Sequence, residues 1–312
     1  MTNIDKNTEI FYIVDEFLKI FYQYVEKHHI SYKKSKRRNR KYRMSDSEII
    51  TILILYHLSG YKNFKVFYTN GVQIGLKNDF PKTVSYNRFL ELREKVFIPM
   101  ACLLKNKLLS KCTGISFIDS TPLKACDLHR IGLLKTLKLY ANKGKCSMGW
   151  FYGFKLHIIC NEKGEIVNFQ VTKGNVDDRQ VLKDKEIIKS IKGKLLGDRG
   201  YVSRELTQEL YKSGIQLITK LKSNMKNILM DRKDKLLLKH RGLIESLNNK
   251  LKNSCEIEHS RHRSLNGFLV NIISALSAYQ LMPNKPHIRY FNKHNPLIPN
   301  DISEIFPLFI PK

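Results

Sequence analysis

Apolar residues recur at helical spacing in the first third of the chain. Ser45 and Glu48 form a capping box, in which each side chain satisfies a backbone amide at the start of an apolar helix through Tyr56. Residues 83–104 predict a further helix. The first predicted helix carries a stripe at three- and four-residue spacing, made of Ile10, Val14, Phe17, Leu18, Phe21 and Val25. This pattern predicts a helical domain over residues 1–110.

The periodicity changes in the second third of the chain, where alternation typical of strands begins. Residues 115–121 predict a short strand that Pro122 ends, and residues 123–150 predict a basic, irregular stretch. Apolar and polar residues then alternate over residues 151–160, and residues 165–172 return as the second strand of a hairpin.

Helices and strands alternate after this hairpin. The order β-β-β-α-β-α-β-α predicts a mixed α/β domain over residues 111–282, ending in a largely buried helix at 266–282. Residues 283–312 hold six of the nine prolines and predict an irregular C-terminal tail. The alternating elements are a helix from a cap at Asn175 or Asp177 to about residue 192, a strand at 194–197, a helix at 203–212, a strand at 215–221 and a helix at 235–252.

The net charge of +27 makes a polyanion the expected partner of the chain. Nucleic acid is the first expectation and an acidic membrane surface the second. The apolar runs fall far short of the roughly 20 residues that a membrane helix needs, and the first residues do not resemble a signal peptide. We therefore expect a cytoplasmic, nucleoid-associated protein. The six cysteines form no CxxC or CxxH pair, which argues against a zinc site or a disulfide framework.

Two segments of the helical domain are candidates for DNA contact. Residues 31–43 hold eight Lys and Arg and no acid, which indicates either a solvated linker or a phosphate-contacting arm. The net charge favours the arm, with Arg37, Arg38 and Arg40 at its centre. The predicted helix at 83–104 carries Asn and Arg near its start, as a helix-turn-helix recognition helix would, and a plain helical bundle is the equal alternative.

Three acids occupy positions that the predicted topology brings together. Asp119 lies in the first strand, Asp198 ends a later strand, and Glu245 lies on the last helix of the alternating unit. Taken alone, the first two also suit turns, and the third suits a solvated helix surface. Neighbouring carboxylates repel one another, and hard cations such as Mg²⁺ or Mn²⁺ relieve the repulsion. Two such ions roughly 4 Å apart clamp the attacking and leaving oxygens of a phosphodiester.

Four short motifs follow one another in this part of the chain. They are Phe117-Ile118-Asp119-Ser120, Tyr152-Gly153-Phe154-Lys155-Leu156-His157, Gly197-Asp198-Arg199-Gly200-Tyr201 and Gly242-Leu243-Ile244-Glu245-Ser246-Leu247. In this order they resemble bacterial insertion-sequence transposases of the DDE class. The resemblance covers roughly residues 110–282 and implies an RNase H-like mixed sheet flanked by helices. It also implies that Asp119, Asp198 and Glu245 hold two Mg²⁺ or Mn²⁺ ions, assembled with DNA, for phosphodiester hydrolysis and strand transfer.

The resemblance implies double-stranded DNA as the partner, both the ends of a mobile element and the target DNA. The helical domain over residues 1–110 would recognise the ends. Pairing two ends implies a homodimer in the active state, and no membrane contact is expected. Two alternatives remain at this point: an RNase H-like nuclease without strand transfer, and a DNA-binding protein without catalysis.

Many of these transposases share the spacing Tyr-x₂-Arg-x₃-Glu-x₆-Lys around the glutamate. Arg241, Glu245 and Lys252 keep this spacing, but Leu238 stands at the tyrosine position. The resemblance implies that Arg241 and Lys252 contact the DNA backbone near the cut. The alternative is an ion pair between Arg241 and Glu245 on one helix face, with a solvated lysine.

Three further residues are auxiliary candidates. Lys155 and His157 share one face of the second strand and would approach DNA or the attacking water, although a single histidine on a strand is more often structural. Trp150 would stack on an unpaired base, with burial in the core as the alternative. Asp177 and Asp178 are rival acids, but their position before a helix favours N-capping.

Overall fold

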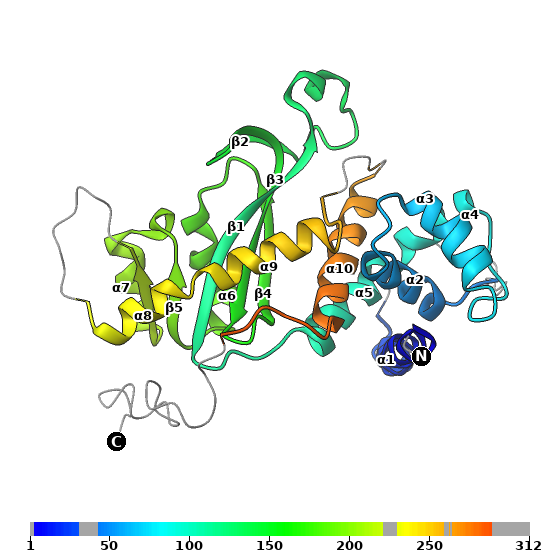
Figure 1. Ribbon diagram of the computed structural model, residues 1–312, viewed down its shortest axis with the longest axis horizontal. Coiled ribbons are helices and arrows are strands. Elements are labelled where there is room, and N and C mark those ends of the chain that lie inside the picture. The colour runs from blue at the N-terminus through cyan, green and yellow to red at the C-terminus, as the bar shows by residue number, and fades with distance from the viewer. Residues whose placement is uncertain (1–2, 31–42, 221–229, 259–261, 263, 289–312) are drawn as a thin grey trace. The chain divides into compact units, whose positions relative to one another are not determined.

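The computed structural model describes residues 3–30, 43–220, 230–258, 262 and 264–288. These residues form two compact units, which are described separately (Figure 1). The first unit comprises the described parts of 1–108 and 250–282, and the second those of 109–249 and 283–312. The sequence instead predicted one domain over 111–282, so the structure divides the chain differently at residues 250–282.

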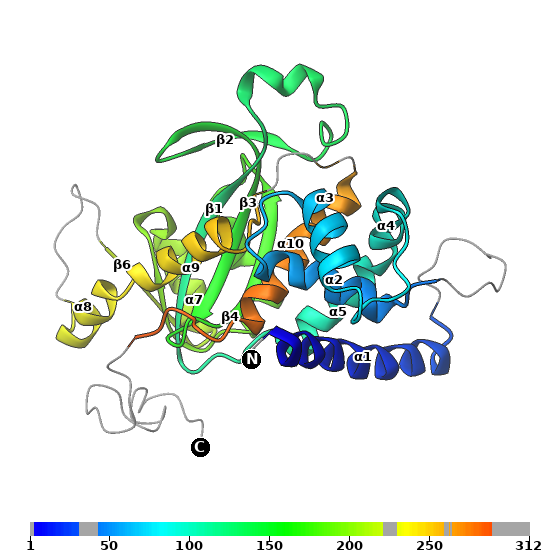
Figure 2. The same ribbon diagram turned by 45° about the vertical axis from the view of Figure 1, so that its right-hand side comes forward.

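Two apolar helices form the centre of the first unit (Figure 2). α2 (Asp46–Leu58) and α10 (Leu265–Leu281) are buried along most of their length and pack against each other. α1 (Asn3–Lys27) packs against α2, and the predicted capping box begins α2. Because α10 is apolar on almost every side, it needs the N-terminal helices as partners, which explains why residues 250–282 join this unit.

The predicted helix at 83–104 is interrupted in the structure. Pro99 explains the interruption, because proline lacks an amide hydrogen and is tolerated only in the first turn of a helix. The segment consists of α4 (Tyr86–Arg93), a 3₁₀ turn at Glu94–Val96 and α5 (Phe97–Leu103). Short helical elements that the sequence analysis did not predict are α3 (Phe64–Val66) and two π-helical segments, Phe67–Gly75 and Leu104–Leu108.

A mixed sheet forms the centre of the second unit (Figure 1). The strand order is β2-β3-β1-β5-β6, and β4 pairs with β3 as well. β3 is antiparallel to β1, β2 and β4, whereas β5 is parallel to both β1 and β6. The bounds are Ile115–Cys126 for β1, Asn142–Cys146 for β2, Gly149–Asn161 for β3, Ile166–Lys173 for β4, Gly193–Gly197 for β5 and Ile215–Thr219 for β6. The predicted α/β class, a mixed sheet flanked by helices, is confirmed.

β1 continues past Pro122, where the sequence predicted its end. β5 pairs with β1 only over Ile115–Phe117, so the rest of β1 has a partner strand on one side alone, namely β3. An open strand edge of this kind tolerates proline, which donates no ladder hydrogen bond. The stretch expected to be irregular, residues 123–150, therefore contains the end of β1, a 3₁₀ helix at Leu128–Leu133 and the additional strand β2.

One face of the sheet carries an apolar core beneath α6 (Lys185–Lys189) and α7 (Arg204–Lys212). The predicted helix up to residue 192 is split into a 3₁₀ helix at Asp178–Lys183 and α6, because Asp184 accepts a hydrogen bond from the Glu186 amide and so begins a new helix. The core includes Ile118, Ile159, Val167, Leu182, Leu195, Leu206 and Leu210.

The opposite face of the sheet carries α9 (Gly242–Asn253), which runs across β1 in both ribbon views (Figures 1 and 2). The predicted single helix at 235–252 is divided into α8 (Arg232–Lys239) and α9. A buried ion pair of 2.6 Å between Asp234 and Lys194 fixes α8 to β5. The break between the two helices gives α9 its own direction across the sheet.

The predicted C-terminal tail contains no helix or strand over its described part, residues 283–288. The Ile288 amide donates to the Glu162 carbonyl oxygen at 3.1 Å, beside the turn between β3 and β4. The described start of the tail is therefore attached to the second unit. The remainder of the predicted tail lies outside the described residues.

Gly153→Ala tests how closely β3 approaches β1. A Cβ at Gly153 would lie 2.1 Å from the Leu123 carbonyl oxygen, a backbone atom that cannot move without disturbing the pairing of β1 and β3. We expect this substitution to destabilise the protein by about 2 kcal/mol or more, seen as a lower melting temperature. Gly132→Ala is the control, because its Cβ meets nothing within 4 Å. Equal melting temperatures of the two variants would contradict the observed strand contact.

Candidate active site

Asp119 lies on β1, and Asp198 directly follows the neighbouring parallel strand β5. β1 and β5 pair with a constant offset of 79 residues, up to the pair of Phe117 and Leu196. Asp119 and Asp198 have the same offset, and Asp198 keeps an extended backbone, so both acids lie just beyond the paired segment of the two strands. Side chains alternate between the faces of a strand, so Asp119 faces away from the core that contains Ile118.

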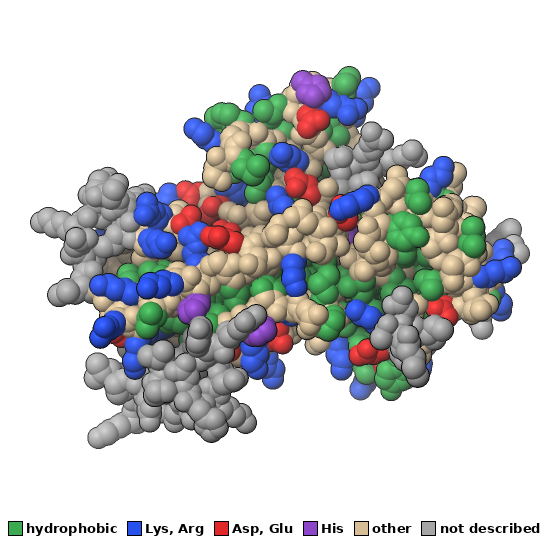
Figure 3. All heavy atoms as spheres, viewed as in Figure 1, with side chains coloured by type: hydrophobic (Ala, Val, Ile, Leu, Met, Phe, Trp, Pro, Cys, Tyr) green, Lys and Arg blue, Asp and Glu red, His purple; other side chains and the backbone are tan. Residues whose placement is uncertain are grey.

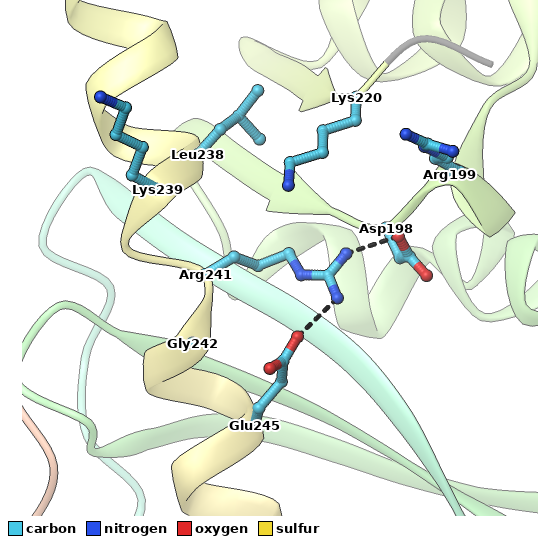
Figure 4. A pocket seen from close by; sticks show the side chains of 8 residues that line it. All are labelled: Asp198, Arg199, Lys220, Leu238, Lys239, Arg241, Gly242 and Glu245. Carbon is cyan, nitrogen blue, oxygen red and sulfur yellow. Dashed lines mark hydrogen bonds and ion pairs between the residues drawn. The ribbon is translucent and has the colours of Figure 1, made fainter. Parts of the chain in front are cut away.

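Glu245 completes the group of acids from the helix that covers this face. It lies in the first turn of α9, four residues after Arg241. The guanidinium of Arg241 lies between two of the acids: its Nη1 donates to Asp198 Oδ1 at 2.5 Å and its Nη2 to Glu245 Oε1 at 2.7 Å (Figure 4). The structure therefore brings together all three predicted acids and the predicted arginine, with the ion pair that the sequence left as an alternative.

A cavity of about 550 Å³ opens beside this ion pair. Figure 4 shows side chains from several elements around it, and the two paired carboxylates remain open to solvent, with Asp198 50% and Glu245 58% exposed. Ions and phosphate groups can therefore reach them. The cavity is lined by Asp198, Arg199, Lys220, Leu238, Lys239, Arg241, Gly242 and Glu245.

Asp119 and Asp198 differ in their protonation equilibria. Burial raises the pKa of Asp119 to about 6, and repulsion from Asp198 and Glu245 adds to the shift, against the opposing effects of the Ser120 amide and Arg241. Partial burial acts to raise the pKa of Asp198 as well, but hydrogen bonds from the Arg199 amide and Arg241 outweigh it and hold that pKa below its usual value. Of these two aspartates, Asp119 is thus the one whose charged form needs a nearby cation more at neutral pH.

The chemistry of these residues fits a hard divalent cation. Three carboxylates offer oxygen ligands and negative charge, which Mg²⁺ and Mn²⁺ prefer. Within the part of the chain that the structure describes, no three Asp, Glu, His or Cys side chains lie closely enough together to hold a metal ion. Arg241 lies between Asp198 and Glu245 and pairs with both.

Lys155 and His157 do not join the acids. Lys155 Nζ forms an ion pair with Asp178 Oδ1 at 2.9 Å, and His157 Nε2 lies 2.8 Å from Thr172 Oγ1. Both residues are on strand positions that face the apolar core side, opposite to the face of Asp119. Burial lowers the pKa of His157 to about 4, so the ring is neutral at physiological pH. The predicted approach of these side chains to DNA or to the attacking water is not what the structure shows.

The remaining candidates have different positions. Trp150 is 61% exposed, with Lys145 Nζ 5.8 Å from the centre of its ring, so burial in the core is excluded. Lys252 pairs with Glu258 at 3.3 Å. Asp177 is an N-cap, as the sequence favoured, whereas Asp178 accepts hydrogen bonds from Ser120 and Lys155. The predicted arm residues Arg37, Arg38 and Arg40 lie outside the described residues.

One residue of the site was not a sequence candidate. Asn248 Nδ2 donates to Asp119 Oδ2 at 3.0 Å, from a side chain that is only 8% exposed. It lies three residues after Glu245 on the predicted helix, so both side chains project from the same helix face. The three-residue spacing from Glu245 was the feature of the sequence that could have indicated Asn248, but a lone Asn on a helix is usually a surface residue.

A transposase DDE domain matches residues 109–265, which is half of the chain and includes all of residues 109–249 of the second unit. The chain belongs to the DDE transposase family. It is therefore a DNA transposase, an enzyme that cleaves DNA and transfers strands, as the resemblance implied. A bacterial insertion sequence as its source stays a prediction.

Two solved transposase structures are similar to this transposase. The first is a cryo-EM structure of the piggyBac transposase synaptic complex with hairpin DNA, at 13% identity and a TM-score of 0.46, covering 78% of this chain and 69% of that one. The second is a crystal structure of a pre-cleavage Mos1 transpososome, at 10% identity and a TM-score of 0.23, covering 84% of both chains. No curated protein matches the chain. Among its described residues, no helix has the length and apolarity to cross a membrane.

Asp119→Asn should stabilise the metal-free protein at pH 7.5 and lose this effect in acid. The folded protein holds the Asp119 proton up to about pH 6, whereas the unfolded chain releases it near 3.8, so keeping Asp119 charged costs stability above pH 6 and nothing below pH 4. The gain should reach up to about 3 kcal/mol, measured as a higher melting temperature in EDTA. Glu205→Gln on α7 is the exposed control. A gain that is equal at pH 4.5 and pH 7.5 would contradict the raised pKa.

Proposed function

We propose that Asp119, Asp198 and Glu245 are the catalytic carboxylates of this transposase. The observation that supports the assignment best is the strand register, because the 79-residue offset between β1 and β5 equals the spacing of the two aspartates. α9 adds the glutamate to the same face of the sheet, beside an open cavity. Three acids from three separate elements, each facing the same side, are better explained by catalysis than by three unrelated local roles.

These carboxylates would hold two Mg²⁺ or Mn²⁺ ions once DNA is bound. The ions would supply stabilisation of the charge that develops on the phosphodiester oxygens. The protein itself would fix the acids on rigid elements, and Asp119 would be ionised at a pH above its raised pKa. Water is the nucleophile for hydrolysis and the released 3′-hydroxyl for strand transfer, so no covalent link between protein and DNA forms.

Basic residues around the cavity are suited to the DNA backbone. Arg199, Lys220 and Lys239 line the cavity with exposed side chains. In Figure 3 a small group of acidic side chains is bordered by Lys and Arg on the face that is shown. This arrangement would draw phosphates toward acids that would otherwise repel them. Trp150, exposed beside Lys145, remains suited to stacking on an unpaired base.

The wider assembly is part of the same proposal. The basic helical region over residues 1–110 would recognise the ends of the element, with Arg37, Arg38 and Arg40 as phosphate contacts, and target DNA would enter at the acids. Pairing two ends requires at least a homodimer. Lys252 would reach the DNA backbone by leaving Glu258, an exchange that a strong phosphate partner favours. Such a protein would act on the chromosome, in the cytoplasm and at the nucleoid.

Substituting each acid separately tests the catalytic assignment. Asp119→Ala, Asp198→Ala and Glu245→Ala should each lower Mg²⁺-dependent cleavage of labelled element-end DNA by roughly 10³-fold or more, because a missing ligand disturbs both ions. Binding of the same DNA, measured by gel shift, should change by less than about threefold. Glu205→Ala, at an exposed acid on α7, is the matched control and should cleave and join DNA like the wild type.

Each outcome bears on a different part of the assignment. Full activity in any one of the three variants would remove that acid from the site. If Asp198→Ala kept its activity and Asp178→Asn lost it, the second catalytic acid would be Asp178, on the opposite face of the sheet. Cleavage by the wild type without joined products would contradict strand transfer at this site.

Arg241 would change partners when the ions and DNA bind. Its guanidinium is only 20% exposed and bonds both Asp198 and Glu245, so it stands where positive charge is needed between them. A divalent cation at the same carboxylates would repel it. The released guanidinium would then reach a DNA phosphate, which suits its two donor groups.

Arg241→Gln should therefore have opposite effects on metal binding and on catalysis. We expect the DNA-free variant to bind Mn²⁺ several-fold more tightly than the wild type, measured by electron paramagnetic resonance, because no internal cation competes for the carboxylates. Cleavage of element-end DNA should fall, because a phosphate contact is lost. Arg179→Gln is the control, since that arginine pairs with Asp177 and does not line the cavity. Weaker Mn²⁺ binding by Arg241→Gln would show instead that Arg241 holds the carboxylates in place.

A further inference from the structure

A buried amide contacts the most deeply buried acid of the site. Asn248 Nδ2 donates a hydrogen bond to Asp119 Oδ2 at 3.0 Å. The group that contacts this oxygen is therefore a neutral donor and not a cation. A carboxylate oxygen that accepts an amide hydrogen is less available to a metal ion, so this contact would favour the other oxygen, Oδ1, as a ligand atom.

The same amide has an unsatisfied atom. Asn248 Oδ1 is buried and has no hydrogen-bond partner among the described residues, and the orientation of the amide is fixed because an amide oxygen facing Asp119 would be repelled. A buried acceptor without a partner costs about 1–3 kcal/mol. An apolar side chain of similar size would avoid this cost. Packing alone therefore does not explain an asparagine here, and the hydrogen bond to Asp119 does.

Asn248 also connects two of the elements that carry acids. Asn248 lies three residues after Glu245 on α9, which is about 4.5 Å along the helix axis. Its hydrogen-bond partner, Asp119, lies on β1. A hydrogen bond at this point fixes the rotation of α9 over the sheet. The position of Glu245 relative to Asp119 depends on that rotation.

We propose that Asn248 is a positioning residue of the catalytic site, which holds Asp119 with one oxygen free for the metal ion and sets α9 so that Glu245 faces the same ion. The inference rests on the proposed roles of Asp119 and Glu245. It assigns to Asn248 no contact with DNA. Its substitution should therefore affect metal binding and turnover, and leave DNA affinity and folding nearly unchanged.

Asn248→Leu tests the proposal, because leucine has a similar size and no donor. The Mn²⁺ affinity of the protein bound to a duplex that already ends at the cleavage point should fall on the order of tenfold, measured by electron paramagnetic resonance. The turnover number for cleavage should fall with the KM for DNA unchanged. The loss should be larger with Mg²⁺ than with Mn²⁺, because Mg²⁺ demands nearly ideal octahedral geometry. The melting temperature should stay within a few degrees of the wild type.

Two further variants make the result decisive. Asn249→Leu, at the neighbouring exposed position of α9, should match the wild type in Mn²⁺ affinity and in the ratio of the two metals. Asn248→Asp, which places a second carboxylate against Asp119, should fall below Asn248→Leu in turnover. Unchanged Mn²⁺ affinity and an unchanged metal ratio in Asn248→Leu would overturn the positioning role and leave the catalytic carboxylates in place. A wild-type complex that binds no Mn²⁺ would overturn the proposed site itself, and Asn248 with it.

Discussion

The mutual repulsion of three carboxylates on one face of a sheet governs the second unit of this transposase. Asp119 is raised in pKa by burial and by the other two acids, so the face needs positive charge at neutral pH. Arg241 provides it through two ion pairs. Because Arg241 precedes α9, the same interaction also holds the start of that helix near the end of β5. The need for positive charge on this face therefore helps to position α9.

Because side chains alternate along β1, residues that stabilise the fold lie on one face of the sheet and the acids lie on the other. Ile118 lies in the apolar core with α6 and α7, whereas its neighbour Asp119 faces α9. Lys155 and Asp178 are charged residues on the core side of the sheet, and they neutralise each other in an ion pair. A shift of β1 by one residue would exchange the two faces, so the closely packed pairing of β1 with β3 protects the site as well as the fold.

Sequence patterns correctly predicted those features that depend on a single helix or strand. The capping box at Ser45 and the alternation that became β3 are local, and both were predicted. The spacing of Asp119 and Asp198 was also visible, although its meaning as a strand register required the structure. What the sequence could not show depends on partners distant in the chain: β1 passes Pro122 because β5 ends early, and Lys155 is committed to Asp178 by tertiary packing.

In the proposed mechanism, DNA binding and metal binding would each be opposed by a charge that the other removes. The acids beside the cavity would repel a phosphodiester, although Arg199 and Lys220 would attract it. Arg241 lies between Asp198 and Glu245, where it would repel a divalent ion. A phosphate that accepts hydrogen bonds from Arg241 would free both carboxylates for the ions, and the ions would reduce the repulsion between the carboxylates and the phosphate. By linkage the two ligands would then strengthen each other's binding equally, which would couple assembly of the reactive site to the presence of its substrate.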